Sequence, residues 1–293
     1  MSGVFLGVET GGSKILARLV SEDGGLVAEG RWPTSTPDAA ADAISRFVAE
    51  AKVGADLRGV GLAAFGPLIV DPDSSDQGRV LATPKPGWTG SNLRRELARR
   101  LGVPVRVDTD VNAAALAELT LGAGRDVATL AYITVGTGIG GGLAMRSGTL
   151  RGALHPEIGH LRLVRAAGDK AQSACPYHAD CAEGLAAGPA VAARLAGADL
   201  GARPDIQDLV AGYIAQLAVG LVLSWSPHLI VIGGGVGGAP GLLGRIRSAF
   251  GQALGDYGVG PVAHADDFIM APSLADAGLE GALLMAANPE IRP

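Results

Sequence analysis

The sequence predicts a two-domain α/β protein built from two similar halves. Two segments of the form strand, glycine-rich turn, strand support this prediction, one at residues 4–20 and the other at residues 128–145. Each opens a stretch in which short apolar strands are followed by helical segments, a pattern typical of α/β domains. The chain has 293 residues, enough for two domains of ordinary size, and 48% of them are hydrophobic, as in a globular protein.

Composition and charge argue against several classes of protein. The net charge is −5, and Lys and Arg form no long run, so nucleic acid is not an expected partner. No basic and apolar leader segment opens the chain, which predicts a cytoplasmic protein. The most apolar stretch, residues 214–232, is interrupted by Ser-Trp-Ser-Pro-His. We therefore expect a buried helix followed by a buried strand there, and no membrane span.

The first half is expected to alternate strands and helices after its opening turn. Its strands, all short and apolar, are residues 4–8, 15–20, 60–65 and 103–107, with a further return strand after Gly24-Gly25. Its helices are residues 38–53 and 92–101. Ser91 precedes the second helix and is the expected N-cap residue.

The first glycine turn contains Gly11 and Gly12, at which a ligand can approach the backbone. The segment nearly matches a Walker A loop through Gly7, Gly12 and Lys14. The lysine comes one residue late, however, and a strand follows where a helix is required. Taken alone, the segment is better explained as a plain glycine turn.

Asp110 is the candidate general base. The strand at residues 103–107 delivers the sequence Asp-Thr-Asp-Val-Asn to its C-terminal end, just before an alanine-rich helix at residues 113–121. In open α/β sheets the carboxyl ends of the strands face the ligand crevice, and a carboxylate there can accept a proton from a substrate hydroxyl. The alternative is that Asp108 or Asp110 caps the helix that follows.

The second half repeats the first pattern. An apolar strand at residues 128–135 leads into a glycine turn at 136–142 and a return strand at 143–145. The turn contains G-x-G-x-x-G, but no helix follows it, so a dinucleotide site is weakly supported here. If the two glycine turns face each other across a cleft, their backbone N–H groups can cradle phosphates.

A second G-x-G-x-x-G lies at Gly233, Gly235 and Gly238, after an apolar strand at residues 229–232. A helix from about Leu242 follows it, as in a dinucleotide-binding turn. Against that interpretation, no strand ending in an acidic residue appears about twenty positions later, where the ribose contact is expected.

The only two cysteines flank a histidine, and their spacing predicts a metal site. Cys175, His178 and Cys181 are each three residues apart, and His160 lies upstream as a fourth ligand. Two thiolates and two imidazoles form the closed tetrahedral set of structural Zn²⁺ sites. The alternatives are buried apolar cysteines or a short disulfide, but the absence of a leader and of other cysteines argues against the disulfide. Two nearby carboxylates, Glu157 and Glu183, are not needed for the metal, and we expect them to contact another ligand.

With these motifs in place, the chain resembles the ROK group of sugar kinases, within the actin-like ATPase superfamily. The resemblance covers almost the whole chain and rests on five motifs in the family's order. They are the phosphate motifs Gly7–Lys14 and Thr134–Gly140, the signature Glu157–His160, the Cys-His-Cys cluster with Glu183, and the adenosine motif Gly233–Val236. Each glycine motif alone is weak evidence, whereas five in order are specific.

Three details resemble the fructokinase branch of this group. Thr109 stands before the catalytic aspartate, where the usual pattern has asparagine. The loop Thr83–Trp88 is similar to that of fructokinases, and His178 occupies a position where glucokinase-type members have a third cysteine. The change at Thr109 removes a sugar-contacting amide and argues against a glucokinase.

The resemblance implies a fold of two actin-like (ribonuclease H-like) domains with the active-site cleft between them. Residues 1–112 would form the N-terminal domain, joined by a C-terminal helix at about residues 275–293. Residues 113–274 would form the second domain and carry the zinc segment. The resemblance also implies a homodimer.

The implied activity is ATP-dependent phosphorylation of a hexose, D-fructose to fructose 6-phosphate, with Mg²⁺ bound to ATP. Asp110 would be the general base, and the sugar would be bound by Glu157, His160 and Glu183. ATP and its phosphates would be bound by Gly11, Gly12, Lys14, Thr134, Gly136, Thr137, Gly138, Gly234 and Gly235. Structural Zn²⁺ would be held by His160, Cys175, His178 and Cys181. Whether Lys14 contacts phosphate or a neighbouring carboxylate stays open.

Other functions are kept as alternatives. The strongest is a kinase for glucose, mannose or an N-acetylated sugar. A non-kinase dinucleotide-binding protein would use Gly233 to Gly238. A ROK transcriptional repressor would carry a helix-turn-helix before the first phosphate strand, and that strand begins at Val4. A sugar sensor without catalysis would be favoured by loss of Asp110, which is present.

Overall fold

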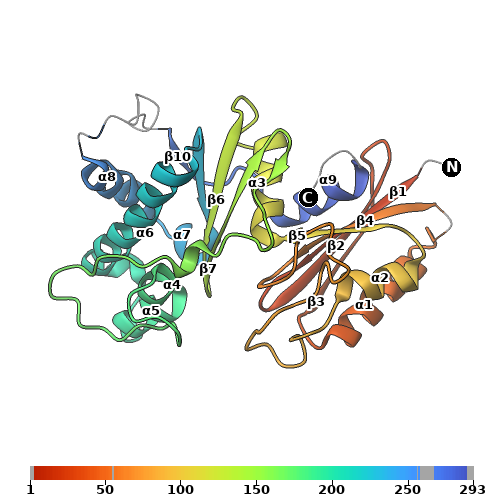
Figure 1. Ribbon diagram of the computed structural model, residues 1–293, viewed down its shortest axis with the longest axis horizontal. Helices are drawn as coiled ribbons and strands as arrows, with labels where there is room; N and C mark the ends of the chain where they lie inside the picture. Colours follow the sequence, from red (N-terminus) through yellow and green to blue (C-terminus); the bar gives the residue numbers. More distant parts are fainter. Residues whose placement is uncertain (1–2, 55, 256, 258–266, 289–293) are drawn as a thin grey trace. The chain divides into compact units, whose positions relative to one another are not determined.

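The fold contains two five-stranded sheets, each with helices of its own (Figure 1). The computed structural model describes residues 3–54, 56–255, 257 and 267–288. By contacts between residues, the chain divides into two compact units. Unit 1 comprises Met1–Ala117, Ala144–Pro156 and Leu274–Pro293, and unit 2 comprises Glu118–Leu143 and Glu157–Ser273. The domain boundaries given above from the sequence stay a prediction.

The first sheet has the strand order β3-β2-β1-β4-β5. Its strands are β1 (Val4–Thr10), β2 (Lys14–Ser21), β3 (Leu26–Pro33), β4 (Leu57–Ala64) and β5 (Val105–Thr109). β1, β2 and β3 are paired antiparallel, while β4 runs parallel to β1 and β5 parallel to β4. Parallel neighbours need a crossover, and α1 (Pro37–Glu50) and α2 (Leu93–Leu101) lie in the two crossovers.

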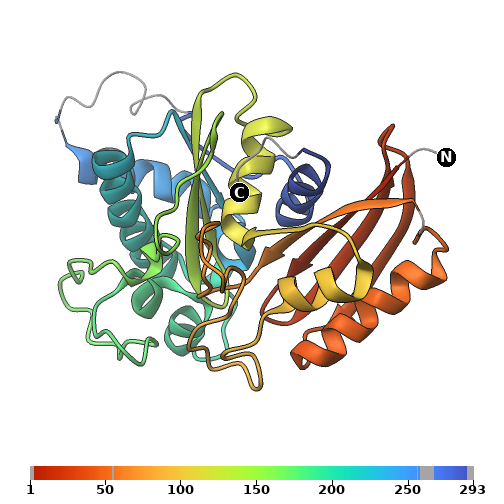
Figure 2. The same cartoon turned by 45° about the vertical axis from the view of Figure 1, so that its right-hand side comes forward.

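Alternation of side chains along β1 sends two sets of residues to opposite faces of this sheet. Val4, Leu6 and Val8 belong to a buried apolar cluster that includes Ile44 of α1 and Leu97 of α2. Helix α9 (Ala277–Ala287) contacts β1 and β4 and lies on the other side of the sheet (Figure 2). The sheet is therefore covered on both faces, as expected for strands with parallel neighbours.

The second sheet repeats the order of the first. Read from β8, its order is β8-β7-β6-β9-β10, which matches β3-β2-β1-β4-β5 in chain order. The strands are β6 (Thr129–Val135), β7 (Ile139–Met145), β8 (Gly148–Thr149), β9 (Leu229–Gly233) and β10 (Ile269–Met270). β9 is parallel to both β6 and β10. The duplicated architecture expected from the two glycine turns is thereby confirmed.

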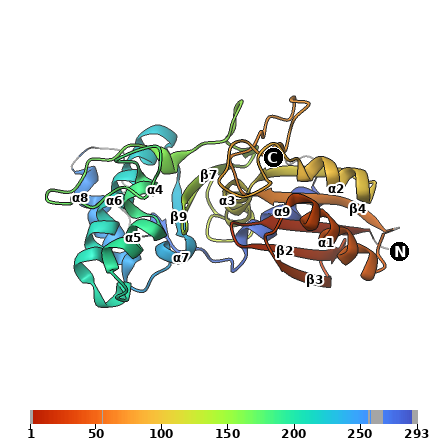
Figure 3. The same cartoon turned by 90° about the horizontal axis from the view of Figure 1, so that it is seen from below.

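Most helices of unit 2 lie between β8 and β9. They are α4 (Ala182–Ala186), α5 (Gly188–Leu195) and α6 (Pro204–Trp225), with short 3₁₀ helices at Ile158–His160 and Leu200–Ala202. After β9 come α7 (Gly234–Gly237) and α8 (Leu242–Leu254). α6 packs against α8 and contacts α4 and α5 (Figure 3). Of the helices in the described ranges, α6 alone is long and apolar enough to cross a membrane, and 61% of its apolar window is buried inside the protein.

Three local predictions are corrected by the structure. Asn92, and not Ser91, caps α2: its side chain accepts the Arg95 N–H at 2.9 Å, while the Ser91 hydroxyl donates to the carbonyl of Trp88 at 2.7 Å. Helix α3 spans Asp110–Thr120 and begins three residues earlier than expected.

The second glycine turn is also shorter than predicted, because β7 already begins at Ile139. Gly141 lies within that strand, where a Cβ atom would come within 2.2 Å of the Ile158 side chain. Glycine is required here by close packing and not by a turn, a distinction that the run of glycines in the sequence does not reveal.

Candidate active site and metal centre

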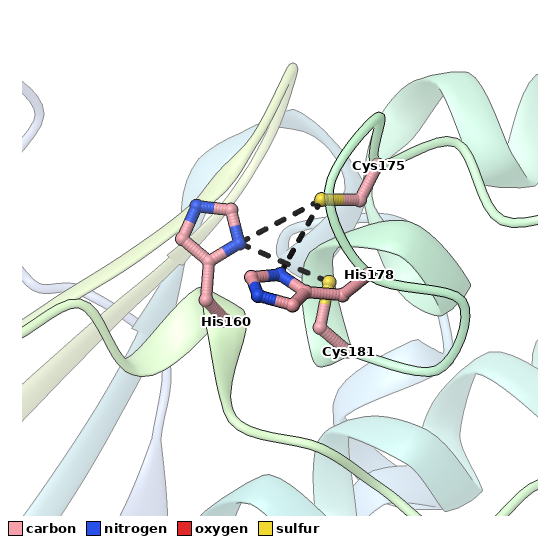
Figure 4. A group of neighbouring side chains, drawn as sticks. All are labelled: His160, Cys175, His178 and Cys181. Carbon is pink, nitrogen blue, oxygen red and sulfur yellow. Dashed lines mark hydrogen bonds between the residues drawn. The ribbon is translucent and has the colours of Figure 1, made fainter. Parts of the chain in front are cut away.

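The four predicted metal ligands lie together in unit 2. His160 ends the 3₁₀ helix Ile158–His160, Cys181 immediately precedes α4, and Cys175 and His178 lie on the loop between them. Figure 4 shows the two rings and the two thiols pointing toward one another. One donor atom from each side chain lies within 4.8 Å of each of the others.

The separations between donor atoms fit a tetrahedral zinc site. The Nδ1 atom of His160 lies 3.8 Å from the Sγ atom of Cys175 and 3.9 Å from the Sγ atom of Cys181. The Nδ1 atom of His178 lies 3.8 Å from the Sγ atom of Cys175. Tetrahedral zinc with ordinary bond lengths places sulfur and nitrogen ligands about 3.6 Å apart. The cluster can therefore hold a metal ion, and its donor set is one that zinc favours.

The loop that carries Cys175 and His178 is held by hydrogen bonds between its two ends and within the loop. The Ala182 N–H donates to the carbonyl of Leu161 at 2.9 Å, so the segment returns to its starting point. The Ser173 hydroxyl accepts the Cys175 N–H at 3.2 Å and donates to the carbonyl of His178 at 2.6 Å. These bonds fix the backbone at Cys175 and His178 relative to each other, so the two candidate ligands stay close together.

A buried ion pair anchors the same loop to α5 and α6. The Asp169 carboxylate accepts hydrogen bonds from Arg194 at 2.8 Å and from the Tyr213 hydroxyl at 2.6 Å, and the side chains of Asp169 and Arg194 are 6% and 5% exposed. Burial raises the pKa of Asp169, but the hydrogen bonds from Tyr213 and Arg194 outweigh burial and lower the pKa to about 2. The sequence analysis missed this cluster, because its members lie on three separate elements.

Cys181 joins the metal centre to α4. Burial raises the pKa of its thiol to about 11. The thiolate is the form that binds metal, so an ion bound here must displace a proton from Cys181. The same sulfur accepts the N–H of Gly184 at 3.3 Å and so acts as the N-cap of the helix.

The two carboxylates expected to bind sugar occupy different surroundings in unit 2. Glu157 is exposed and precedes the 3₁₀ helix, where its carbonyl accepts the His160 N–H at 3.0 Å. Glu183 lies in the first turn of α4, and its Oε2 atom accepts the N–H of Ile139 at 3.0 Å. This bond connects the segment that carries the candidate metal ligands to the second glycine turn and was not expected from the sequence.

The second glycine turn and the predicted adenosine motif line a common pocket in unit 2. The pocket has a volume of about 430 Å³, within the size range of small-molecule sites. Its lining residues are Gly136, Thr137, Gly188, Pro189, Ala192, Gly235 and Val236. Two motifs that are almost 100 positions apart in the sequence are thus brought together, as a nucleotide site built from both requires.

Gly234 has a backbone conformation that only glycine adopts easily. Its φ angle is +88°, and a Cβ atom there would lie 2.5 Å from the carbonyl oxygen of Val135 in β6. The adjacent Gly235 has open space around the position of a Cβ atom. The chain therefore packs closely against β6 at Gly234. At Gly235, which lines the pocket, the backbone is accessible.

Asp110 is the first residue of α3 and follows β5 directly. Its Oδ1 atom accepts the N–H of Val111 at 2.9 Å. The Thr109 hydroxyl accepts the N–H of Asn112 at 3.1 Å and so caps the helix, the role that the alternative interpretation of the sequence considered for Asp108 or Asp110. Asp108 is completely buried, and its carboxylate accepts a hydrogen bond from the Thr149 hydroxyl.

The first glycine turn lies in unit 1, between β1 and β2. The Gly11 N–H donates to the carbonyl of Lys14 at 2.8 Å, which closes the turn, and Gly12 is exposed. Burial raises the pKa of Glu9 at the end of β1, while the charge of Lys14 and the N–H of Leu279 in α9 act in the opposite direction. Lys14 therefore has a carboxylate neighbour in Glu9.

The predicted site residues are distributed over both units. Unit 1 contains Gly11, Gly12, Lys14 and Asp110. Unit 2 contains Thr134, Gly136, Thr137, Gly138, Glu157, His160, Cys175, His178, Cys181, Glu183, Gly234 and Gly235. Within unit 2 the structure brings the metal ligands together, and Glu183 reaches the glycine turn.

Comparisons with known proteins identify the family of this chain. The ROK family profile matches residues 5–288. The chain is 36% identical over 282 residues to the fructokinase of Pediococcus pentosaceus, covering 95% of this chain and 96% of that one. It is 36% identical over 291 residues to the fructokinase of Zymomonas mobilis, covering 97% and 96%. The crystal structure of a ROK family glucokinase from Streptomyces griseus in complex with glucose and AMPPNP has a TM-score of 0.75 and 30% identity, covering 97% of this chain and 99% of that one. The chain belongs to the ROK family, whose sugar kinases have the actin-like ATPase fold.

Proposed function

We propose that this chain is an ATP-dependent hexose kinase that converts D-fructose to fructose 6-phosphate. The observation that carries the proposal is the similarity to two fructokinases over nearly the whole length of each chain. Thr109 before Asp110, and His178 between the two cysteines, are local features in which the sequence resembles the fructokinase branch. A cytoplasmic location and a homodimer are part of the same proposal.

Asp110 is the general base of the proposed reaction. It stands at the junction of β5 and α3, where the backbone N–H of Val111 holds one carboxylate oxygen at 2.9 Å. In this role the carboxylate accepts the proton of the sugar hydroxyl as the hydroxyl oxygen attacks the γ-phosphate of ATP. Phosphoryl transfer needs little covalent help from the protein, so the other residues act mainly by positioning and by neutralising charge.

The glycine turns bind the phosphates of ATP through backbone N–H groups. The residues assigned to the phosphates are Gly11, Gly12 and Lys14 of the first glycine turn and Thr134, Gly136, Thr137 and Gly138 of the second. The segment at Gly234 and Gly235 contacts the adenosine, in keeping with the pocket that Gly235 lines together with Gly136. Mg²⁺ bound with ATP would supply the neutralising charge on the phosphates. Phosphates held in this way present the γ-phosphate to the acceptor.

Glu157, His160 and Glu183 bind the sugar hydroxyls. The Nδ1 atom of His160 faces the two thiols, which leaves its Nε2 atom for the substrate (Figure 4). Zn²⁺ bound to His160, Cys175, His178 and Cys181 would fix the orientation of this ring and of the loop, and would be structural. Sugar binding therefore depends on the same segment that holds the metal ligands.

The test is ADP release with Mg·ATP over a panel of fructose, glucose, mannose and N-acetylmannosamine, with Asp110→Asn measured alongside. Release with fructose, lost in Asp110→Asn, supports both the substrate and the base. The absence of release with every sugar, in protein of known metal content, would overturn the proposal.

Glucose is the second candidate acceptor. The observation in its favour is the Streptomyces griseus glucokinase, which was solved with glucose and AMPPNP and shares 30% identity with this chain. Release with glucose and none with fructose would retain the reaction and replace the acceptor. Comparing kcat/KM between the two sugars decides between them, because discrimination is a ratio of these constants.

A further inference from the structure

A carboxylate that follows the candidate metal ligands, that of Glu183, is hydrogen-bonded to the residue that follows the second glycine turn. The Oε2 atom of Glu183 lies 3.0 Å from the backbone nitrogen of Ile139, the first residue of β7, and accepts its N–H. Gly138, the last residue of the turn, lies beside the same oxygen: a Cβ atom added there would come within 2.6 Å of it. Glu183 thus sets the position at which the turn enters β7.

The other end of the turn is held by the residues that follow α4. The N–H of Gly188, at the start of α5, donates to the carbonyl of Gly136 at 2.7 Å, and the Gly136 N–H donates to Gly138 at 2.9 Å. The segment from Glu183 to Gly188 therefore contacts both ends of the turn. Gly136 and Gly188 also line the pocket assigned above to the nucleotide.

The segment from Glu183 to Gly188 follows a candidate metal ligand, Cys181, by two residues. Cys181 precedes α4 and accepts the Gly184 N–H, and the Ala174 N–H donates to the carbonyl of Gly184 at 2.9 Å. The path from the metal centre to the glycine turn is thus a single five-residue helix with both ends hydrogen-bonded. A short helix is marginal in isolation, so its geometry depends on these end contacts.

We propose that Glu183 is a positioning residue for the nucleotide: it fixes the phosphate turn Gly136–Gly138 and links the order of the metal centre to it. The inference rests on the proposed function of this pocket and adds a role that the sugar contact of Glu183 does not include. A carboxylate has two oxygens and several lone pairs, so the bond to Ile139 is compatible with a sugar hydroxyl on the same group. The consequence is that nucleotide affinity depends on Glu183 when no sugar is present.

The experiment is titration of metal-loaded protein with AMPPNP and Mg²⁺ in the absence of sugar. Glu183→Ala is expected to bind about tenfold more weakly, the size of effect typical of a lost hydrogen bond to a charged group. Glu183→Gln keeps an acceptor oxygen for the Ile139 N–H and is expected to restore most of the affinity. Asp208→Ala removes an exposed carboxylate from the same unit and is the matched control.

A double-mutant cycle tests the contact itself. Gly138→Ala places its methyl group against the Glu183 carboxylate and meets no other atom within 4 Å, so it is expected to weaken AMPPNP binding in the wild-type background. In the Glu183→Ala background that clash is absent, and Gly138→Ala is expected to have little further effect. Strictly additive changes would overturn the proposal.

Hydrogen exchange provides a readout that does not depend on the ligand. The Ile139 amide is expected to exchange faster in Glu183→Ala than in Glu183→Gln or wild type, with metal content and thermal stability measured on the same samples. Equal AMPPNP affinity and equal Ile139 exchange in folded, metal-loaded Glu183→Ala would refute the role of Glu183. Wild-type protein that binds no AMPPNP would instead refute the proposed function of the pocket, which keeps the two failures distinct.

Discussion

The hydroxyl of Thr149 donates a 2.6 Å hydrogen bond to the Oδ2 atom of Asp108, a carboxylate that is completely buried. The Oδ1 atom accepts two more, from the Asn112 side-chain amide at 2.8 Å and from the Thr109 N–H at 2.7 Å. Burial raises the pKa of Asp108, and these donors oppose that effect. Because two of the donors flank Asp110 in sequence, the network holds the backbone on both sides of the candidate base.

Replacing Thr149 by valine is expected to destabilise the protein by about 1–3 kcal/mol, because a buried acceptor loses a donor while the side chain keeps its shape. Thr149→Ser retains the hydroxyl and is expected to lie closer to wild type. Urea unfolding at neutral pH measures the difference. Equal free energies of unfolding for the valine and serine variants would contradict the role given to this hydrogen bond.

The N-cap of α2 is Asn92 and not Ser91, and substitution of each residue tests this assignment. Asn92→Ala removes the acceptor for the Arg95 N–H and is expected to cost about 1 kcal/mol of stability. Ser91→Ala, at the position that the sequence pattern favours, leaves that N–H bonded to Asn92 and is expected to cost less. The reverse order in chemical denaturation would restore Ser91 as the cap.

Features that depend on local pattern could be predicted from the sequence. The apolar runs at residues 4–8 and 229–232 both lie in strands, because such runs bounded by glycine are a local signal. The spacing of Cys175, His178 and Cys181 indicated a metal cluster for the same reason, since one short loop carries all three. What the pattern could not decide was the choice between adjacent candidates, such as Ser91 and Asn92, which depends on where each side chain finds a partner.

Features that depend on contacts between distant elements were not predictable. Asp169 pairs with Arg194 and Tyr213, and Glu183 with Ile139, through contacts that span 25 to 44 positions. A single carboxylate in a sequence does not specify which donor will face it after folding. These contacts nevertheless determine how the metal loop and the glycine turn are held, so the most informative parts of the site required the structure.

The Asp169 cluster predicts a specific acid sensitivity. Its folded-state pKa of about 2 lies below the ordinary value of 3.8, so its contribution to stability is present above about pH 4 and is lost as pH falls toward 2. A shift of this size corresponds to about 2 kcal/mol. Asp169→Asn is therefore expected to be less stable than wild type at pH 5, with the gap narrowing near pH 2.5.

Urea unfolding of both proteins at the two pH values measures this gap. Wild type and variant carry the same candidate metal ligands, so the difference between the two proteins reports the change at Asp169. Asp205→Asn serves as a control, because Asp205 has a similarly low pKa but an exposed side chain, where an ion pair contributes little. A gap that stays constant between pH 5 and pH 2.5 would show that Asp169 does not act through its charge.

The proposed zinc site predicts that loss of the metal weakens binding of the proposed substrate, fructose, and destabilises unit 2, because one ion would hold His160 and the loop from Cys175 to Cys181 together. His178→Ala leaves three ligands and is expected to lose the ion, whereas His178→Cys supplies a thiolate in its place and is expected to retain it, since three cysteines and one histidine also form a structural zinc set. Metal content by mass spectrometry, the KM for fructose and the unfolding free energy should change together in His178→Ala and little in His178→Cys.

Wild-type protein stripped by a strong chelator should resemble His178→Ala and recover on addition of Zn²⁺, because binding energy at a structural site contributes to folding. Unchanged fructose affinity in fully stripped protein would show that the metal centre does not organise the sugar site, even if the chain phosphorylates fructose.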